Sequence, residues 1–101
     1  MKCIIKRPFD PIGYMDDVPN TLEALQYQVD GYIETVTVRD GLVIICNEDG
    51  KLTGMAPNFK IGSEQFVGTV IVVGTDGEEF TDVPIELGDW LEMLIEWGNE
   101  V

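Results

Sequence analysis

The stretch Tyr32–Gly50, YIETVTVRDGLVIICNEDG, decides the fold that the rest of the chain must complete. Asp40-Gly41 separates two runs rich in β-branched and aromatic residues. This pattern predicts a hairpin, because the turn requires positive φ and Gly supplies it without steric cost. Every residue of the second run, Leu42–Cys46, is apolar. We therefore expect that strand to be covered on both faces, inside a sheet.

The sequence around this hairpin predicts further strands. Lys2–Lys6 and Phe66–Val73 are apolar enough to form two of them, and Glu79–Val83 is expected to return as an edge strand after a Gly-rich turn. Segments 7–19 and 51–65 contain Pro and Gly at intervals. We expect both segments to be loops, the second with at most one helical turn.

Two helices are predicted from apolar residues at helical spacing. The first covers about residues 21–30, with Asn20 as its N-cap. The second covers about residues 87–97, or begins only at Trp90 if Asp89 caps it. A chain of 101 residues is long enough for one core. The prediction is one α+β domain, residues 1–101, with a mainly antiparallel sheet of four or five strands and both helices on its core-facing side.

The packing of this sheet can be stated residue by residue. Val43 and Ile45 are expected to be buried together with Val70 and Val72. Cys3 and Cys46 lie in apolar strand-like contexts, so we expect reduced, buried thiols rather than a disulfide. No apolar run has the length of a membrane span, and the N-terminus lacks a signal-peptide core. A cytoplasmic location is the expectation.

Negative charge is concentrated in the last part of the chain. The formal net charge is −13; residues 1–60 hold nine acids and six bases, whereas residues 61–101 hold ten acids and no base. Such a field repels nucleic acid, whose binding depends on Lys and Arg. We therefore expect no direct nucleic-acid binding, and a partner protein with a basic surface. The alternative is that the acidity serves solubility alone.

The residues needed for common catalytic sites are missing. The chain contains no His, and its single Ser63 lies in a Gly-flanked loop without the spacing of a nucleophile elbow. No phosphate loop or calcium loop fits the sequence around Gly50 or Gly77. We expect neither an enzyme nor a metal or other cofactor.

Two sets of residues are candidates for binding. The set for a basic partner comprises Glu78, Glu79, Asp82, Asp89, Glu92 and Trp97. The set for a small ligand comprises Asn47, Lys51 and Asn58, in the loops of residues 47–58. The alternative for the second set is that both Asn side chains satisfy local backbone groups. Only Lys51 and Lys60 are bases near these loops, which is few for a phosphate ligand.

The second helix has more apolar surface than one sheet face usually covers. Six apolar residues between Trp90 and Trp97 span about 200° of arc at roughly 100° per residue. The surplus indicates either deep burial or a contact with another molecule. We expect this helix to form a homodimer, or to dock the partner protein, along its Met93–Trp97 side.

Several segments resemble a known family. They are NTLEALQ (20–26), GYIETV (31–36), VIICNEDGKL (43–52) with Gly54, Pro57 and Asn58, Gly68-Thr69, and VVGTDGEEF (72–80). Together they resemble a domain-of-unknown-function family of small proteins from bacteriophages and mobile elements of Gram-positive bacteria. The resemblance covers most of residues 2–82, leaves the last helix outside, and departs after Asn58, where a basic residue is expected. It implies a phage or mobile-element context and transfers no catalytic residues.

These observations favour one function and leave an alternative. The favoured function is a non-enzymatic phage or mobile-element accessory protein that binds and inhibits a host protein, a defence nuclease being one candidate, with its acidic surface against a basic nucleic-acid-binding site. The alternative is a small-ligand module for a nucleotide signal, built on the loops of residues 47–58.

Overall fold

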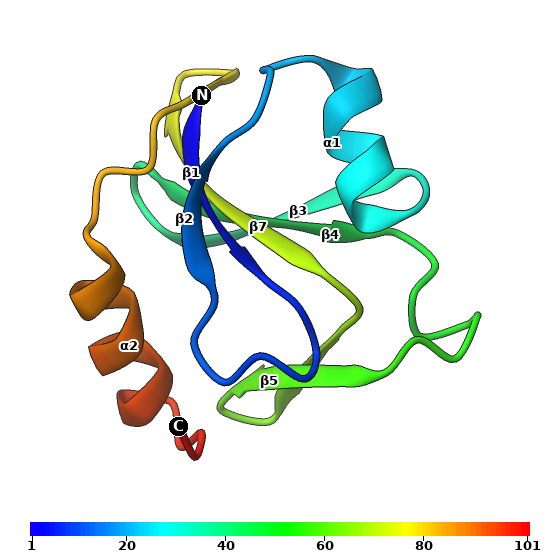
Figure 1. Ribbon diagram of the computed structural model, residues 1–101, viewed down its shortest axis with the longest axis vertical. Coiled ribbons are helices and arrows are strands. Elements are labelled where there is room, and N and C mark those ends of the chain that lie inside the picture. The colour runs from blue at the N-terminus through cyan, green and yellow to red at the C-terminus, as the bar shows by residue number, and fades with distance from the viewer.

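The computed structural model describes residues 1–101 and contains a six-stranded sheet, a separate two-stranded hairpin and two helices (Figure 1). The elements in chain order are β1 (Lys2–Lys6), β2 (Tyr14–Asp17), α1 (Leu22–Val29), β3 (Ile33–Arg39), β4 (Leu42–Asn47), β5 (Pro57–Ile61), β6 (Glu64–Val67), β7 (Val70–Asp76), β8 (Glu79–Thr81) and α2 (Leu87–Glu96). Every strand pair is antiparallel. The predicted α+β class is confirmed, with more strands than expected.

Strand β7 lies at the centre of the large sheet. The strand order is β2-β1-β7-β4-β3, and β8 pairs with β7 as well. The first part of β7 pairs with β1, where Ile4 is opposite Val72, and its last part pairs with β8, where Thr75 is opposite Phe80. Strands β1 and β8 therefore share one edge of β7, while β4 occupies the other.

The predicted hairpin at Asp40-Gly41 is present. Arg39 pairs with Leu42 across a two-residue connection, and Gly41 has φ +82°. Residues 42–45 of β4 are buried, as the uninterrupted apolar run indicated. The turn residues and the apolar strand thus agree on one local structure.

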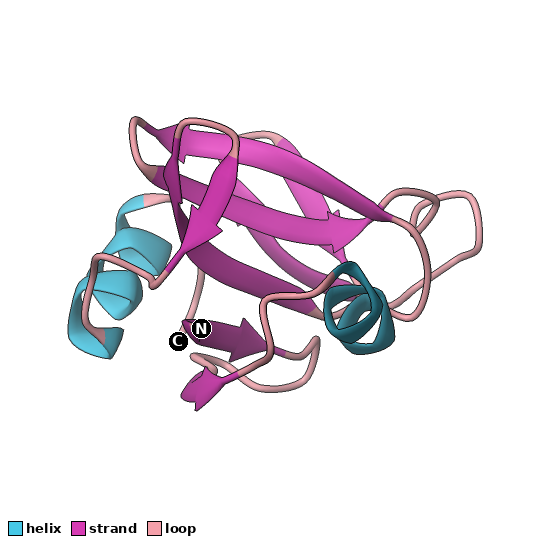
Figure 2. Cartoon of the chain, turned by 90° about the horizontal axis from the view of Figure 1, so that it is seen from above, coloured by secondary structure: helices cyan, strands magenta, loops and turns pink.

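The two helices cover opposite faces of the sheet. Side chains on one face, including Val43, Ile45 and Ile71, pack under Leu25 and Val29 of α1. Alternate residues on the other face pack under α2 and the β5–β6 hairpin. Figure 2 shows the helices at opposite sides of the molecule. The prediction that both helices share one face is wrong, because strands that are apolar at every position need cover on both faces.

The same alternation corrects the predicted partners of Val43 and Ile45. Val43 is opposite Val73 and Ile45 is opposite Ile71, so these four side chains share the α1 face. Val70 and Val72 are also buried, but they point to the α2 face. One residue of register separates the two sets, since successive strand side chains point to opposite faces.

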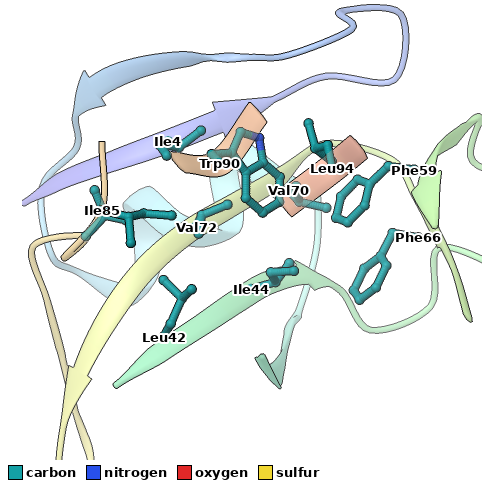
Figure 3. Close-up of a cluster of buried hydrophobic side chains, with 11 residues drawn as sticks. Ile4, Leu42, Ile44, Phe59, Phe66, Val70, Val72, Ile85, Trp90 and Leu94 are labelled. Atoms are coloured by element: carbon teal, nitrogen blue, oxygen red, sulfur yellow. The ribbon is translucent and has the colours of Figure 1, made fainter. Parts of the chain in front are cut away.

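The α2 face holds the larger of the two hydrophobic clusters, which contains stacked aromatic rings and part of which Figure 3 shows. The Phe59 and Phe66 rings are stacked with centroids 4.8 Å apart, and Phe59 meets the fully buried Trp90 edge-on at 5.4 Å. Trp97 stacks on the Phe59 ring at 6.2 Å. The β5–β6 hairpin therefore covers much of the apolar arc of α2 that one sheet face could not.

Two segments predicted as loops contain strands. Residues 14–17 form β2, and residues 57–67 form the hairpin of β5 and β6. The expected strand Phe66–Val73 is broken at Gly68, which has φ +70° and whose added Cβ would lie 2.7 Å from the Met55 sulfur. The close approach of Met55 needs Gly at this position.

The helix boundaries agree with the predicted spans 21–30 and 87–97 to within one residue, whereas the alternative start of the second helix at Trp90 is wrong. Thr21 caps α1, its Oγ1 accepting from the Ala24 N–H at 3.2 Å, whereas Asn20 donates to the Phe80 carbonyl. Helix α2 begins at Leu87, because Asp89 accepts from the backbone N–H of Glu86 and so stands inside the first turn. Neither helix is long and apolar enough to cross a membrane.

Candidate functional site

The five acidic residues predicted to bind a partner are all exposed and belong to one continuous segment. Glu78 lies in the β7–β8 turn and Glu79 in β8. Asp82 follows β8, and Asp89 and Glu92 lie on α2. This segment runs from the top of the molecule down one side in Figure 1. The structure therefore places these five acids along one side.

Strand β1 lies between this segment and the acidic strand β2, and Lys2 contacts both. Its backbone N–H donates to Asp82 Oδ1 at 2.8 Å, and its carbonyl accepts from the Val83 N–H. On its other edge Lys2 pairs with Asp17 of β2. A shallow hollow of about 550 Å³ is lined by Asp16 and Asp17 on one side and by Glu86 on the other. Acids far apart in the sequence thus meet around the first residues of the chain.

On α2 the acidic residues continue around a single cation. Asp89, Glu92 and Glu96 line a hollow of about 380 Å³ together with Arg39. Arg39 has no carboxylate within 4.0 Å. We call the exposed acids of β2, the β7–β8 turn, β8, the following segment and α2 the acidic surface; they are Asp16, Asp17, Glu78, Glu79, Asp82, Glu86, Asp89, Glu92 and Glu96.

Almost none of this charge is neutralised within the chain. The ion pairs are Lys51 with Glu64 at 3.0 Å and the N-terminal ammonium with Asp17 at 3.9 Å. Only Asp17 of the acidic surface is in either pair. The other eight carboxylates have no ion-pair partner, and Lys2 and Arg39 are the only cationic side chains that line the same hollows, so the surface carries a strong negative field.

Trp97 is not part of the acidic surface. It is half-buried, forms an edge-on contact with Trp90 at 5.6 Å and stacks on Phe59. It also lines a hollow of about 170 Å³ with Val36, Val38 and Ile61. The structure thus separates Trp97 from the five acids with which the sequence grouped it.

Asn47 has a structural task at the end of α1. Its Nδ2 donates to the carbonyls of Val29 and Asp30, both at 3.0 Å, and its Oδ1 accepts from the Asp49 N–H at 2.8 Å. The side chain thereby satisfies carbonyls that a helix leaves free at its C-terminus. Lys51 is exposed and paired with Glu64.

Asn58 lies in a different place from Asn47 and Lys51. Its Nδ2 donates to the carbonyls of Lys6 at 2.9 Å and Gly68 at 2.7 Å, and its Oδ1 accepts from the Lys6 ammonium. Asn47 and Lys51 line a groove of about 260 Å³, whereas Asn58 lines a separate hollow of about 710 Å³. The three residues predicted to hold a small ligand do not form one site.

The two cysteines are free and lie on opposite faces of the sheet. Cys3 is buried under α1 as predicted, whereas Cys46, also predicted to be buried, is only half-buried on the α2 face. Burial, reinforced by Asp16 beside Cys3 and Glu34 beside Cys46, raises the pKa of each thiol from 9.0 to about 11. Both are therefore protonated near neutral pH and poor nucleophiles. No group of three or more Cys, Asp or Glu side chains is placed to hold a metal ion.

Sequence reasoning missed three residues that the fold brings into these places. Asp16 and Asp17 were assigned to a loop, although an acidic pair on a short edge strand is a usual protection of a sheet edge. Lys6 was assigned only to a strand, yet it is buried and lines the hollow of Asn58. Its signal was a lysine at the end of an apolar run.

Comparison with known proteins gives a family and no activity. The model of a family described as "Domain of unknown function (DUF3846)" matches residues 1–96. The match extends beyond the expected limit near residue 82 and includes α2. No curated protein and no solved structure matches the chain.

Proposed function

The chain belongs to the DUF3846 family, whose description names no activity, and we propose from its own surface that it is a non-enzymatic binding protein for a basic partner. The acidic surface makes the contact, and the partner is a host protein whose nucleic-acid-binding site is blocked. A defence nuclease of a bacterial host is the partner class that fits best. In this proposal the protein acts in the cytoplasm as an accessory factor of a phage or mobile element.

The observation that carries this proposal is the lack of compensation on the acidic surface. Ten acids and no base occupy residues 61–101, and only Glu64 among those acids is ion-paired within the chain. Folding then adds Asp16 and Asp17 from the other end of the sequence. Exposed carboxylates in such an array attract a surface built to bind phosphates, and they speed association rather than merely tightening it.

A small-ligand module for a nucleotide signal, built on residues 47–58, is less well supported. The amide of Asn47 is occupied by α1 and that of Asn58 by two carbonyls and Lys6. Lys51, one of the few bases nearby, is paired with Glu64. An enzymatic function is also not favoured, because both thiols have raised pKa values and no His is present.

The test compares a fourfold amide variant with the wild type. Glu78→Gln, Glu79→Gln, Asp82→Asn and Asp89→Asn remove four charges but keep the acceptor oxygens that Lys2 and Glu86 use. Protein captured from a bacterial lysate at low salt is identified, purified and assayed for nucleic-acid binding. We expect the wild type to inhibit that binding, with weakening as salt rises, and the variant to inhibit it at least about tenfold less.

A matched control carries four amides on exposed acids elsewhere, namely Glu23→Gln, Glu34→Gln, Glu48→Gln and Asp49→Asn. It has the same net charge as the first variant. An equal loss of inhibition in both variants would mean that the acidity acts only through the net charge or the solubility of the protein. If neither variant changes the inhibition, the acidic surface does not take part in the contact.

A further inference from the structure

Lys6 is a buried lysine without an acidic partner. Its exposed fraction is 3%, and no carboxylate lies within 4.0 Å of its ammonium. The ammonium donates to Asn58 Oδ1 and lies 5.7 Å from the centre of the Phe59 ring. A lysine ammonium has three N–H donors, so two of them have no partner in the protein. Buried cations are usually paired or fully hydrogen-bonded.

The ammonium lies at a hollow formed by three distant parts of the chain. The segment after β1, the β5–β6 hairpin and the residues after α2 come together at the lower end of the molecule in Figure 1. The residues that line this hollow of about 710 Å³ include Lys6, Asp10, Asn58, Phe59, Lys60 and Glu100. It is a shallow hollow open to solvent, like the one beside Lys2.

The surroundings of Lys6 are held in a fixed geometry. Both donors of Asn58 are used by the carbonyls of Lys6 and Gly68, so its oxygen must face the ammonium. Asn99 fixes another part of the wall, because its Oδ1 accepts from the Lys60 N–H and its Nδ2 donates to the Lys60 and Leu94 carbonyls. A preformed wall reduces the ordering cost of binding.

We propose that this hollow is a binding site for a small molecule carrying one oxyanion group, a carboxylate or a phosphate. The Lys6 ammonium binds the oxyanion with its two free N–H donors, and Asn58 and Phe59 hold that ammonium in position. Lys60 at the rim supplies a second cation. Asp10 and Glu100, also at the rim, repel highly charged anions, so the site favours ligands of low charge.

The electrostatics of Lys6 agree with this geometry. Burial lowers the pKa of its ammonium from 10.5, and Asp10 only partly opposes that effect. The charged groups that line the hollow with Lys6 are Asp10, Lys60 and Glu100. A bound oxyanion would offset the desolvation of the ammonium and move its pKa back toward the ordinary value.

The test is an NMR titration of the intact protein with sodium phosphate and, separately, sodium acetate, at constant ionic strength set with sodium chloride. We expect saturable shifts at Lys6, Asn58 and Phe59. Lys6→Met should weaken the binding at least about tenfold, because it removes a hydrogen bond to a charged group. Saturation by phosphate alone identifies a phosphate site, and saturation by acetate as well identifies a general oxyanion site.

Two further variants keep the proposal falsifiable. Glu100→Gln removes an exposed like charge from the rim and should tighten binding several-fold, whereas Lys51→Met, on the exposed Lys51–Glu64 pair, should change nothing. No saturable shift, equal shifts with chloride alone, or unchanged affinity in Lys6→Met would overturn the site. If Lys6→Met does not fold, unchanged affinity in Glu100→Gln would overturn it. The fourfold amide variant of the acidic surface should bind normally, so the two proposals fail independently.

Discussion

Trp90 connects the helix α2 to a segment 78 residues away. Its ring is fully buried, and its Nε1 donates to the Ile12 carbonyl at 2.9 Å. Its indole also meets the rings of Phe59 and Trp97 edge-on. One side chain thus joins α2, the segment between β1 and β2, and the β5–β6 hairpin.

Replacing Trp90 should therefore be costly. Trp90→Phe removes the donor of the Ile12 carbonyl and part of the buried volume, so we expect a loss of about 2–4 kcal/mol of unfolding free energy. Trp97→Phe is the matched control, because Trp97 is only half-buried and its indole nitrogen has no hydrogen-bond partner in the chain. Urea unfolding measures both variants. Equal losses would contradict the assigned role of Trp90.

The two thiols make stability depend on alkaline pH. Both pKa values are raised from 9.0 to about 11. The folded state then binds more protons than the unfolded state between these values, so the thiols stabilise fully below pH 9 and lose that effect as the pH rises toward 11. The pKa of Lys6 is lowered from 10.5, so its contribution to the unfolding free energy has the opposite sign and rises with pH below 10.5.

The prediction is a fall in unfolding free energy between pH 9 and 11 that is less steep in Cys46→Ala and Cys3→Ala. Comparing slopes with the wild type separates the thiols from Lys6. We also expect native Cys3 to resist a thiol reagent more than the half-buried Cys46. Identical slopes in the three proteins would show that the thiols are not responsible.

At the scale of elements, the β3–β4 hairpin and the start of α2 provide a matched pair of glycines. Gly41 has φ +82°, and an added Cβ at Gly41 or at Gly88 meets no atom within 4 Å. Only the backbone conformation separates them, because Gly88 lies in the first turn of α2 and its φ is not in the left-handed region. A difference in stability between Ala substitutions at the two positions would therefore not come from clashes of the added methyl group.

Gly41→Ala should cost about 1 kcal/mol because an L-residue is strained at this φ. Gly88→Ala should instead stabilise by up to about 1 kcal/mol through helix propensity and lower entropy of the unfolded chain. Thermal and urea unfolding of both variants measure the two signs. A stabilising Gly41→Ala would mean that the turn relaxes to another type.

At the scale of the whole molecule, net charge opposes compactness. With a net charge of −13 and few ion pairs, the folded chain repels itself. The Debye length is about 30 Å at 0.01 M salt and about 8 Å at 0.15 M. The melting temperature should therefore rise over this range, and rise less in the fourfold amide variant. A melting temperature that is independent of salt would contradict the repulsion.

Self-association through α2 stays a prediction, with a smaller contact than the sequence indicated. Met93 and Trp97 are half-buried, so Ile95, 54% exposed, is the main apolar residue left on the helix surface. Analytical ultracentrifugation at high salt, where repulsion between copies is screened, should detect the dimer. Ile95→Ala should weaken it, while Leu52→Ala, also exposed but away from α2, should not. A wild-type monomer at high concentration would end this proposal.

The local features of the fold were determined by the sequence alone. Turn chemistry placed the hairpin at Gly41, and helical spacing of apolar residues placed α1 and α2 to within a few residues. The uninterrupted apolar run of β4 required cover on both faces. Each of these follows from interactions between residues near one another in the chain, which a pattern can show.

Only the tertiary structure decided what lies next to what. Strands β2 and β5 gave no local signal, because each exists through pairing and through cover of the sheet edge or of α2. The acidic surface depends on β1 pairing with β2 and contacting Asp82, and the Lys6 hollow on three segments meeting at one end. Such sites are made by contacts between residues distant in sequence, whose register and direction no local pattern fixes.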